Sequence, residues 1–294
     1  MGARRRSGAA LAVLALAGGA AAFGMYLLAA QPQEGEPSGR CTAWLDDASA
    51  TLTAEQAGNA ALIAAASTRL GLPARGATIG LATAMQESSL VNLDYGDRDS
   101  IGLFQQRPSQ GWGTVEEIMD PYYSADTFYR ALVKVGGWQD MAVTVAAQTV
   151  QRSAFPDAYG NHETRARLWA SALRGYSGAM AVDCDVAAGP GTTAAAFIDR
   201  VERDFGEGAY QVRSLRSPDG EVWLDVVPAA TDDAGRDAFA AWAVAVAATE
   251  SVEQVADGAA GWTRGAGLGE VEAPARPLGV AVRLLPVTPP VDSR

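Results

Sequence analysis

The chain has 294 residues, which is long enough for two modest domains. Hydrophobic residues make up 48% of it, as is ordinary for a globular protein. The formal net charge of −11 argues against nucleic acid as a partner, because phosphate binding needs clustered cations and Lys134 is the only lysine.

The first residues contain a candidate membrane segment. Three arginines at positions 4–6 precede a stretch without charge from Ala9 to Ala30, about the ~20 residues that a helix needs to cross a bilayer. The arginines should stay in the cytoplasm, so residues 1–30 predict a single-pass anchor in the cell membrane with the rest of the chain outside. The alternative is a signal peptide cleaved near residues 20–22, which would give a secreted protein.

The next segment leads into the first predicted domain. Residues 31–40 (QPQEGEPSGR) are polar and rich in proline and glycine, which indicates a linker. Cys41 and Cys184 are the only cysteines, and outside the cytoplasm an isolated pair favours a disulfide over a metal or redox site. Two independent buried thiols are the alternative. The pair brackets a domain over residues 41–184.

Helices dominate the prediction for this domain. Thr53 followed by Gln56 is typical of a capping box, and Gly71 is expected to end the helix that follows. Residues 92–114 form a polar loop dense in glycine and aspartate. Helices are expected over residues 54–70, 77–87, 122–135, 141–153 and 161–174.

A second linker and a second domain follow. Residues 185–192 have linker composition, and residues 193–294 predict a small α+β domain. Helices are expected over 193–205 and 232–249, and strands over 210–216, 221–227 and 280–285. A glycine-rich stretch at 265–269 has no strand leading into it, so it is not interpreted as a phosphate-binding loop.

The stretch from Ala82 to Thr114 contains the candidate functional residues. Glu87 and Ser88 stand at the end of the helix predicted over 77–87, and 15 positions after Glu87 the segment 102–105 reads Gly-Leu-Phe-Gln.

These residues resemble those of the lytic transglycosylase and goose-type lysozyme superfamily, whose members place the catalytic Glu in a Glu-Ser pair at a helix end, before a Gly-Leu-Met-Gln-like segment. The segment 102–105 matches the second element, with Phe for Met. The family's later Tyr-containing motif has its nearest counterparts in Gln148 and Tyr159.

The resemblance leaves out residues 193–294 and implies that the helical domain over 41–184 is lysozyme-like. With the segments predicted above, the expected fold class is a mostly α lysozyme-like domain followed by a small α+β domain, with an N-terminal transmembrane helix. It also implies cleavage of the β-1,4 bonds of bacterial peptidoglycan glycan strands, with Glu87 as general acid/base.

Glycoside cleavage itself requires a proton-donating acid. A glycosidic oxygen is a poor leaving group, so a carboxylic acid that keeps its proton near neutral pH must protonate it. Apolar surroundings would raise the pKa of Glu87. The residues that we expect to contact the sugar or orient the acid are Ser88, Ser100, Gln105, Gln106 and Trp112. The alternative for Glu87 is a solvated acid at a helix end.

A hydrolase of this kind usually needs a second carboxylate about 5 to 9 Å away, whereas a lytic transglycosylase uses a hydroxyl of the substrate itself. Asp97 and Asp99 are the candidates for a second acid, and a solvated turn is their alternative role. No metal is expected, because His162 is the only histidine and a calcium loop starting at Asp97 would place Ile101 at a ligand position. No cofactor is implied.

The sequence therefore predicts an enzyme of the cell envelope whose partners are peptidoglycan and, through the N-terminal helix, the cytoplasmic membrane. A different class of protein is the alternative: a noncatalytic peptidoglycan-binding or scaffold protein, whose C-terminal domain holds an unknown protein partner. Hydrolysis and transglycosylation both stay open.

Overall fold

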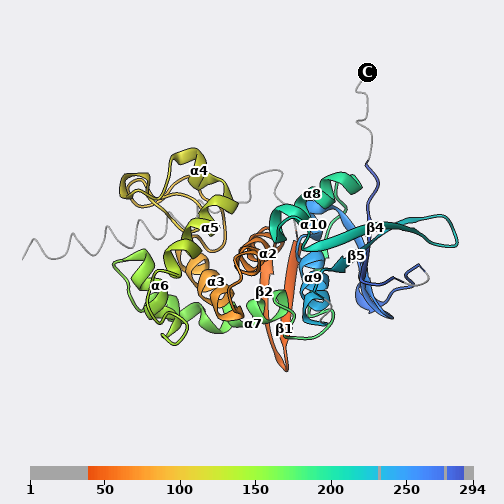
Figure 1. Cartoon of the computed structure of the whole chain (residues 1–294), viewed down its shortest axis with the longest axis horizontal. Coiled ribbons are helices and arrows are strands. Elements are labelled where there is room, and N and C mark those ends of the chain that lie inside the picture. Colours follow the sequence, from red (N-terminus) through yellow and green to blue (C-terminus); the bar gives the residue numbers. More distant parts are fainter. Residues whose placement is uncertain (1–38, 231–232, 275–276, 288–294) are drawn as a thin grey trace, which may run out of the picture. The chain divides into compact units, whose positions relative to one another are not determined.

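The computed structural model describes residues 39–230, 233–274 and 277–287, which belong to one compact unit (Figure 1). The predicted membrane segment, residues 1–30, and most of the predicted linker over 31–40 lie outside the described residues. Within the described residues, no helix has both the length and the apolar character needed to cross a membrane.

A small antiparallel sheet opens the described chain. Its strands are β1 (Gly39–Leu45), β2 (Ala48–Thr53) and β3 (Val182–Val186), in the order β2-β1-β3. Cys41 and Cys184 occupy directly paired positions of β1 and β3, with their Cα atoms 4.0 Å apart, and they form a disulfide. The predicted disulfide is confirmed, and it closes a loop of 143 positions.

Helices fill the chain between β2 and β3. They are α2 (Ala54–Arg69), α3 (Ala74–Ser88), α4 (Val115–Met119), α5 (Pro121–Leu132), α6 (Val143–Gln151) and α7 (Glu163–Leu173), with short 3-10 helices η1 (Pro108–Gln110) and η2 (Ala158–His162). The predicted capping box is present: the Thr53 hydroxyl accepts from the Gln56 backbone N–H, and the Gln56 side chain accepts from the Thr53 backbone N–H.

A second, larger sheet and three helices make up the rest. The elements are α8 (Ala194–Phe205), β4 (Tyr210–Arg216), β5 (Val222–Pro228), α9 (Asp233–Ala245), α10 (Ala247–Glu250), β6 (Val252–Asp257), β7 (Ala260–Thr263), β8 (Gly267–Glu270) and β9 (Val280–Leu284). The six strands are antiparallel throughout, in the order β4-β5-β9-β6-β7-β8.

The predicted fold class, a mostly α lysozyme-like domain followed by a small α+β domain, is wrong. Two antiparallel sheets are present, and the first of them lies within the region predicted to be helical. Its strands were missed because β1 and β3 are distant in sequence and bury small residues such as Ala43, so their alternation is weak. Strands β7 and β8 were missed because glycine interrupts them.

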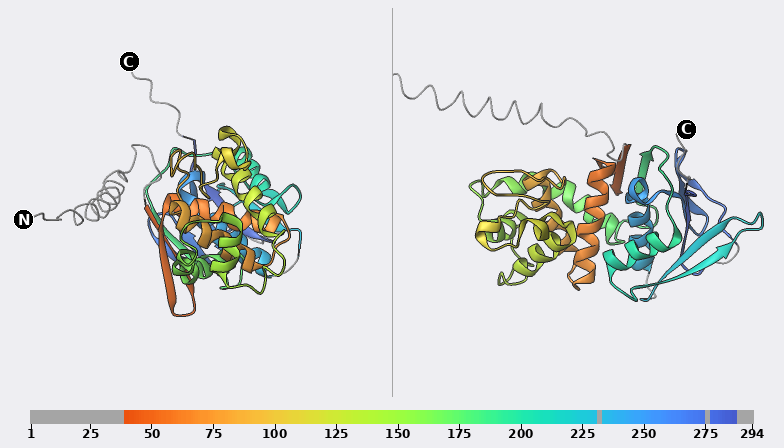
Figure 2. Two further views of the ribbon diagram at one scale, coloured as in Figure 1. Left: turned by 90° about the vertical axis from the view of Figure 1, so that its left-hand side faces the viewer. Right: turned by 90° about the horizontal axis from the view of Figure 1, so that it is seen from above.

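Helix α2 packs against elements from both parts of the chain. It contacts α3, α5 and α7 on one side and α8, α9 and α10 on the other, and the view from above shows it between them (Figure 2). Tyr129 of α5 donates a hydrogen bond to the Ile63 carbonyl of α2, 3.0 Å away. Gly80 of α3 makes room for that ring, because a Cβ at this position would collide with it.

The two parts share one continuous hydrophobic core, which includes Ile63 of α2, Trp169 of α7 and Trp242 of α9. The predicted linker over 185–192 begins inside β3, which ends at Val186. The helices and the larger sheet therefore form a single packing unit.

A buried carboxylate ties three helices together across this core. Asp204 of α8 is fully buried and accepts hydrogen bonds from Tyr122 of α5 (2.6 Å), Trp242 of α9 (2.6 Å) and Arg200 of its own helix (2.8 Å). Arg200 also pairs with Glu250 of α10, 3.0 Å away. A buried charge with this many partners is compensated only while all of them are in place.

Removing the disulfide should destabilise the fold. The bridge reduces the number of conformations that the unfolded chain can adopt. The Cys41→Ala/Cys184→Ala variant should therefore lose about 2–5 kcal/mol of unfolding free energy. Denaturant titration of the oxidised wild type and the variant measures this difference. A loss below about 0.5 kcal/mol would show that the closed loop contributes nothing to stability.

Removing the carboxylate of Asp204 should have a similarly large effect. Asp204→Ala takes one of two carboxylate partners from Arg200, which keeps only Glu250. It also takes the acceptor from Tyr122 and Trp242, so the expected loss is about 3–5 kcal/mol. Asp199→Ala, an exposed acid on the same helix, is the matched control and should change stability by less than about 0.5 kcal/mol. Equal thermal midpoints for the two variants would contradict this assignment.

Candidate active site

Helix α3 ends at a defined point because side chains of α2 bind the residues that follow it. Ser89 and Leu90 both have positive φ, 55° and 63°, which stops the helix. Gln56 of α2 donates to the Ser89 carbonyl and Asn59 to the Leu90 carbonyl, each over 2.8 Å. These bonds fix the position of Glu87, which lies in the last turn of α3.

The carboxyl group of Glu87 has two polar neighbours from distant parts of the chain. The Tyr159 hydroxyl of η2 donates a hydrogen bond to Glu87 Oε1 over 2.6 Å. Gln151, the last residue of α6, also hydrogen bonds to Glu87, and its amide donates to the Phe104 carbonyl over 2.7 Å. Glu87, Gln151 and Tyr159 thus form one cluster.

Burial raises the pKa of the Glu87 carboxyl above its ordinary value of 4.5, while the hydrogen bonds from Tyr159 and Gln151 oppose this by favouring the ionised form. Burial and the nearby Glu87 charge raise the pKa of Tyr159, so its hydroxyl keeps its proton and stays a donor. Glu87 is therefore half-buried, raised in pKa and held by donors, which suits a group that gives and takes a proton.

The Gly-Leu-Phe-Gln segment packs against this cluster through its backbone. The Ser88 hydroxyl donates to the Leu103 carbonyl over 2.7 Å, and Phe104 stacks on Phe128 with ring centroids 4.6 Å apart. Ser88 was predicted to contact substrate, but it is 2% exposed and joins α3 to the segment. Gln105 adopts φ 46°, and its amide lies 3.3 Å from the Tyr95 carbonyl, where it closes the loop.

The remaining predicted substrate residues separate into two groups. Gln106 is buried and donates to the Ser124 carbonyl over 3.0 Å, so it points into the protein. Ser100 is 8% exposed within the loop. Trp112 is half-buried and lines a groove.

Neither candidate for a second acid shares a hydrogen bond with Glu87, Gln151 or Tyr159 among the described residues. The Asp97 side chain is 91% exposed. Asp99 accepts from Ser109 and Arg107, 2.8 and 2.7 Å away, and these bonds hold the pKa of its carboxyl well below its usual range.

A groove of about 880 Å³ begins at this cluster. Gln151, which bonds to Glu87, is one of its lining residues, and the α5 end, the α6 end and the loop after η1 form its walls. The lining residues are Gln110, Trp112, Ala131, Lys134, Val135, Gly136, Met141, Thr149, Val150, Gln151 and Arg152. A strand-like ligand in the groove would reach the Glu87 cluster.

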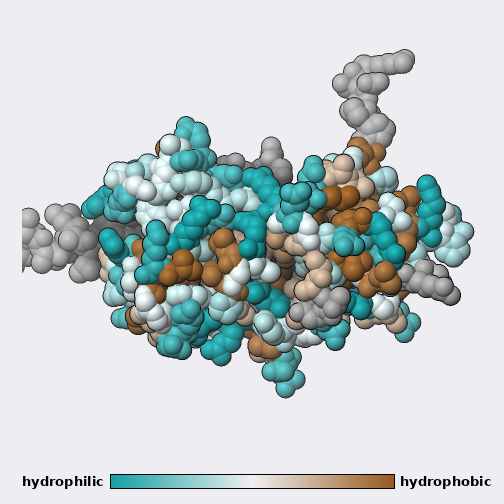
Figure 3. Space-filling view, viewed as in Figure 1, coloured by the Kyte–Doolittle hydropathy of each residue, from teal (hydrophilic) through white to brown (hydrophobic). Residues whose placement is uncertain are grey.

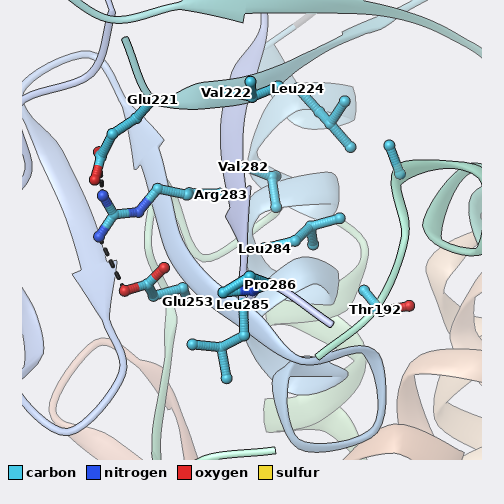
Figure 4. A pocket seen from close by; sticks show the side chains of 11 residues that line it. Thr192, Glu221, Val222, Leu224, Glu253, Val282, Arg283, Leu284, Leu285 and Pro286 are labelled. Carbon is cyan, nitrogen blue, oxygen red and sulfur yellow. Dashed lines mark hydrogen bonds and ion pairs between the residues drawn. The ribbon is translucent and has the colours of Figure 1, made fainter. Parts of the chain in front are cut away.

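A second cavity of about 390 Å³ lies on the larger sheet, next to β5, β6 and β9. Apolar surface gathers over this part of the molecule (Figure 3), and Val222 in the cavity wall is 49% exposed. Arg283 is the cavity's one cation, and Figure 4 shows it held between Glu221 and Glu253. Its charge is already neutralised by these two carboxylates.

Comparison with known proteins gives no match: no model of a protein family fits the chain, and no curated protein matches it.

Two members of the cluster were not assigned a role from the sequence. Tyr159 was named only as a counterpart of the family's tyrosine, and the structure places its hydroxyl on Glu87. Gln151 was missed in favour of Gln148, whose amide instead donates to the Ser153 carbonyl over 2.9 Å. The two glutamines are three positions apart on one face of α6, so helical spacing alone gives no means to choose between them.

The titration of Glu87 tests the cluster directly. Its carboxyl should titrate above 4.5, and Tyr159→Phe should raise the pKa further, because the lost hydrogen bond favours the ionised form. Carbon NMR titration of glutamate carboxyls, with Glu87 assigned by Glu87→Gln, gives both values. Tyr123→Phe is the control, since its hydroxyl donates to the Trp112 carbonyl. A Glu87 pKa at or below 4.5 would refute the proposed effect of burial.

Proposed function

We propose that the protein cleaves the glycan strands of bacterial peptidoglycan at β-1,4 bonds, with Glu87 as general acid and base. The observation that carries the proposal is the Glu87 carboxyl, which burial raises in pKa and which is hydrogen-bonded to Tyr159 and to Gln151, a residue that lines the groove of about 880 Å³. The match of Glu87, Ser88 and residues 102–105 to the motifs of lytic transglycosylases and goose-type lysozymes supports it.

The proposed reaction begins with the protonated carboxyl of Glu87. It donates its proton to the glycosidic oxygen as the bond from that oxygen to the sugar's anomeric carbon breaks, which leaves an electron-poor sugar ring. The carboxylate of Glu87 then accepts the proton of the hydroxyl that attacks the anomeric carbon, so the acid is regenerated. The Tyr159 hydroxyl stabilises the transient carboxylate through its hydrogen bond.

The attacking hydroxyl belongs to the substrate in this proposal, as in lytic transglycosylases. Asp99 is engaged by Arg107 and Ser109, and a carboxylate held in this way is a poor nucleophile. Attack by the muramyl sugar's own hydroxyl needs no second carboxylate and consumes no water.

The disulfide supports a site of action outside the cytoplasm. Cys41 and Cys184 are bridged, and structural disulfides persist in oxidising compartments. Peptidoglycan lies in such a compartment, so the bond and the proposed substrate agree.

Substitution of the acid tests the proposal. Glu87→Gln should lower the release of soluble fragments from purified peptidoglycan at least about 100-fold, because an amide has no proton to give at the glycosidic oxygen. Mass spectrometry of the wild-type products should find anhydro-muramyl ends, which are lighter than reducing ends by one water. Glu202→Gln, an exposed acid on α8, is the matched control and should retain activity.

The same variant should not lose stability at neutral pH. A carboxyl whose pKa is raised in the folded state contributes stability that is fully present below its unfolded value of 4.5 and is lost as pH rises through the folded pKa. Glu87→Gln has no such loss, so its thermal midpoint at pH 7 should equal or exceed that of the wild type.

Peptidoglycan that the wild type binds without cleaving would contradict the proposed activity and favour the binding role.

A further inference from the structure

We infer that the groove beside Glu87 binds the carboxylates of the peptide stems attached to the glycan strand, through Lys134 and Arg152. The inference rests on the proposed function and adds to it the part of the substrate that determines specificity. Carboxylate recognition by these two cations would position a stem-bearing sugar along the groove.

The charge of the groove is opposite to that of the protein. Acidic residues outnumber basic ones by 34 to 23 in the chain, yet Lys134 and Arg152 line the groove and none of its lining residues is acidic. A positive groove on an acidic protein attracts anions selectively, because the surrounding negative surface repels them elsewhere.

Both cations are available to a ligand. Lys134 and Arg152 are exposed, and neither side chain has a hydrogen bond or an ion pair with any of the described residues. Most arginines on the described surface are engaged, as Arg130 is with Asp126. The cavity on the larger sheet makes the contrast clear, since its cation Arg283 already has two carboxylate partners.

The backbone holds the two cations at the ends of different helices. Lys134 follows α5, while Arg152 ends α6 with φ 54° and directly follows Gln151. Gln151 bonds to Glu87, so Arg152 is one residue from a side chain of the catalytic cluster. A carboxylate on Arg152 would therefore lie near the sugar whose bond is cleaved, and one on Lys134 would lie at the end of α5, another part of the groove lining.

Substrate with and without stem charge tests the inference. The probes are purified peptidoglycan freed of wall-linked polymers, and the same material after its carboxyls are converted to neutral methylamides. The wild type should show a KM on the neutral material higher by roughly tenfold, the effect of two exposed charge contacts. Lys134→Gln/Arg152→Gln should show the same high KM on both materials, with kcat little changed.

A matched control removes the same charge elsewhere. Arg130→Gln/Arg167→Gln takes two exposed cations from α5 and α7 and should keep the wild-type preference, since both side chains pair with acids of their own helices. Loss of preference in this variant would mean that total charge is responsible, and the inference would be wrong.

Binding measured without cleavage separates this inference from the proposed function. Sedimentation of Glu87→Gln with each material should show tighter binding to the charged one, weakened by added salt. Equal binding to both materials overturns the role of Lys134 and Arg152, even where the wild type cleaves. Charge-dependent binding by a wild type that cleaves neither material supports the inference and overturns the proposed activity alone.

Discussion

The structure depends on the burial of α2 from several sides. A helix rich in alanine has small side chains on every face, so other helices can pack closely against it from every direction. Helices α3, α5 and α7 take one side, and α8, α9 and α10 take the other. The helical part and the larger sheet are joined through this helix, because its small side chains leave room for both.

Helix α2 also shapes the candidate site. Its side chains Gln56 and Asn59 bind the carbonyls just beyond α3, so the turn that carries Glu87 cannot extend or fray. Ser88 then fixes the neighbouring loop through the Leu103 carbonyl. The acid is positioned by hydrogen bonds to backbone groups, which leaves its carboxyl available to Tyr159 and Gln151.

Local features of this fold could be predicted from the sequence, and distant pairings could not. The capping box at Thr53, the helix ends near Glu87 and the strand over 210–216 follow from residues close together in the chain. Strand β1 finds its partner β3 more than a hundred residues away, and only the cysteines indicated that contact. Glycine-rich β7 and β8 have too few apolar side chains to show alternation.

For the candidate site, too, local features could be predicted from the sequence, and side-chain directions and distant contacts could not. Glu87 could be proposed because its motif is local, and Trp112 was expected to line a groove because its neighbours form a loop, which agrees with the groove lining. Gln106 and Ser88 were assigned to substrate because the sequence shows polarity but not direction, and both side chains are used by the backbone of the protein itself. Gln151 and Tyr159 reach Glu87 only through the packing of α6 and η2 against α3.

The buried Asp204 also fixes the position of α5, a helix that lines the groove. The hydroxyl of Tyr122, near the start of α5, donates a hydrogen bond to Asp204. The guanidinium of Arg203 lies over the Tyr122 ring, 3.8 Å from the ring centre. The far end of the same helix supplies Ala131 to one wall of the groove. Because the first turn of α5 is bonded to Asp204 of α8, the C-terminal half of the molecule holds in place the helix that forms this wall of the groove.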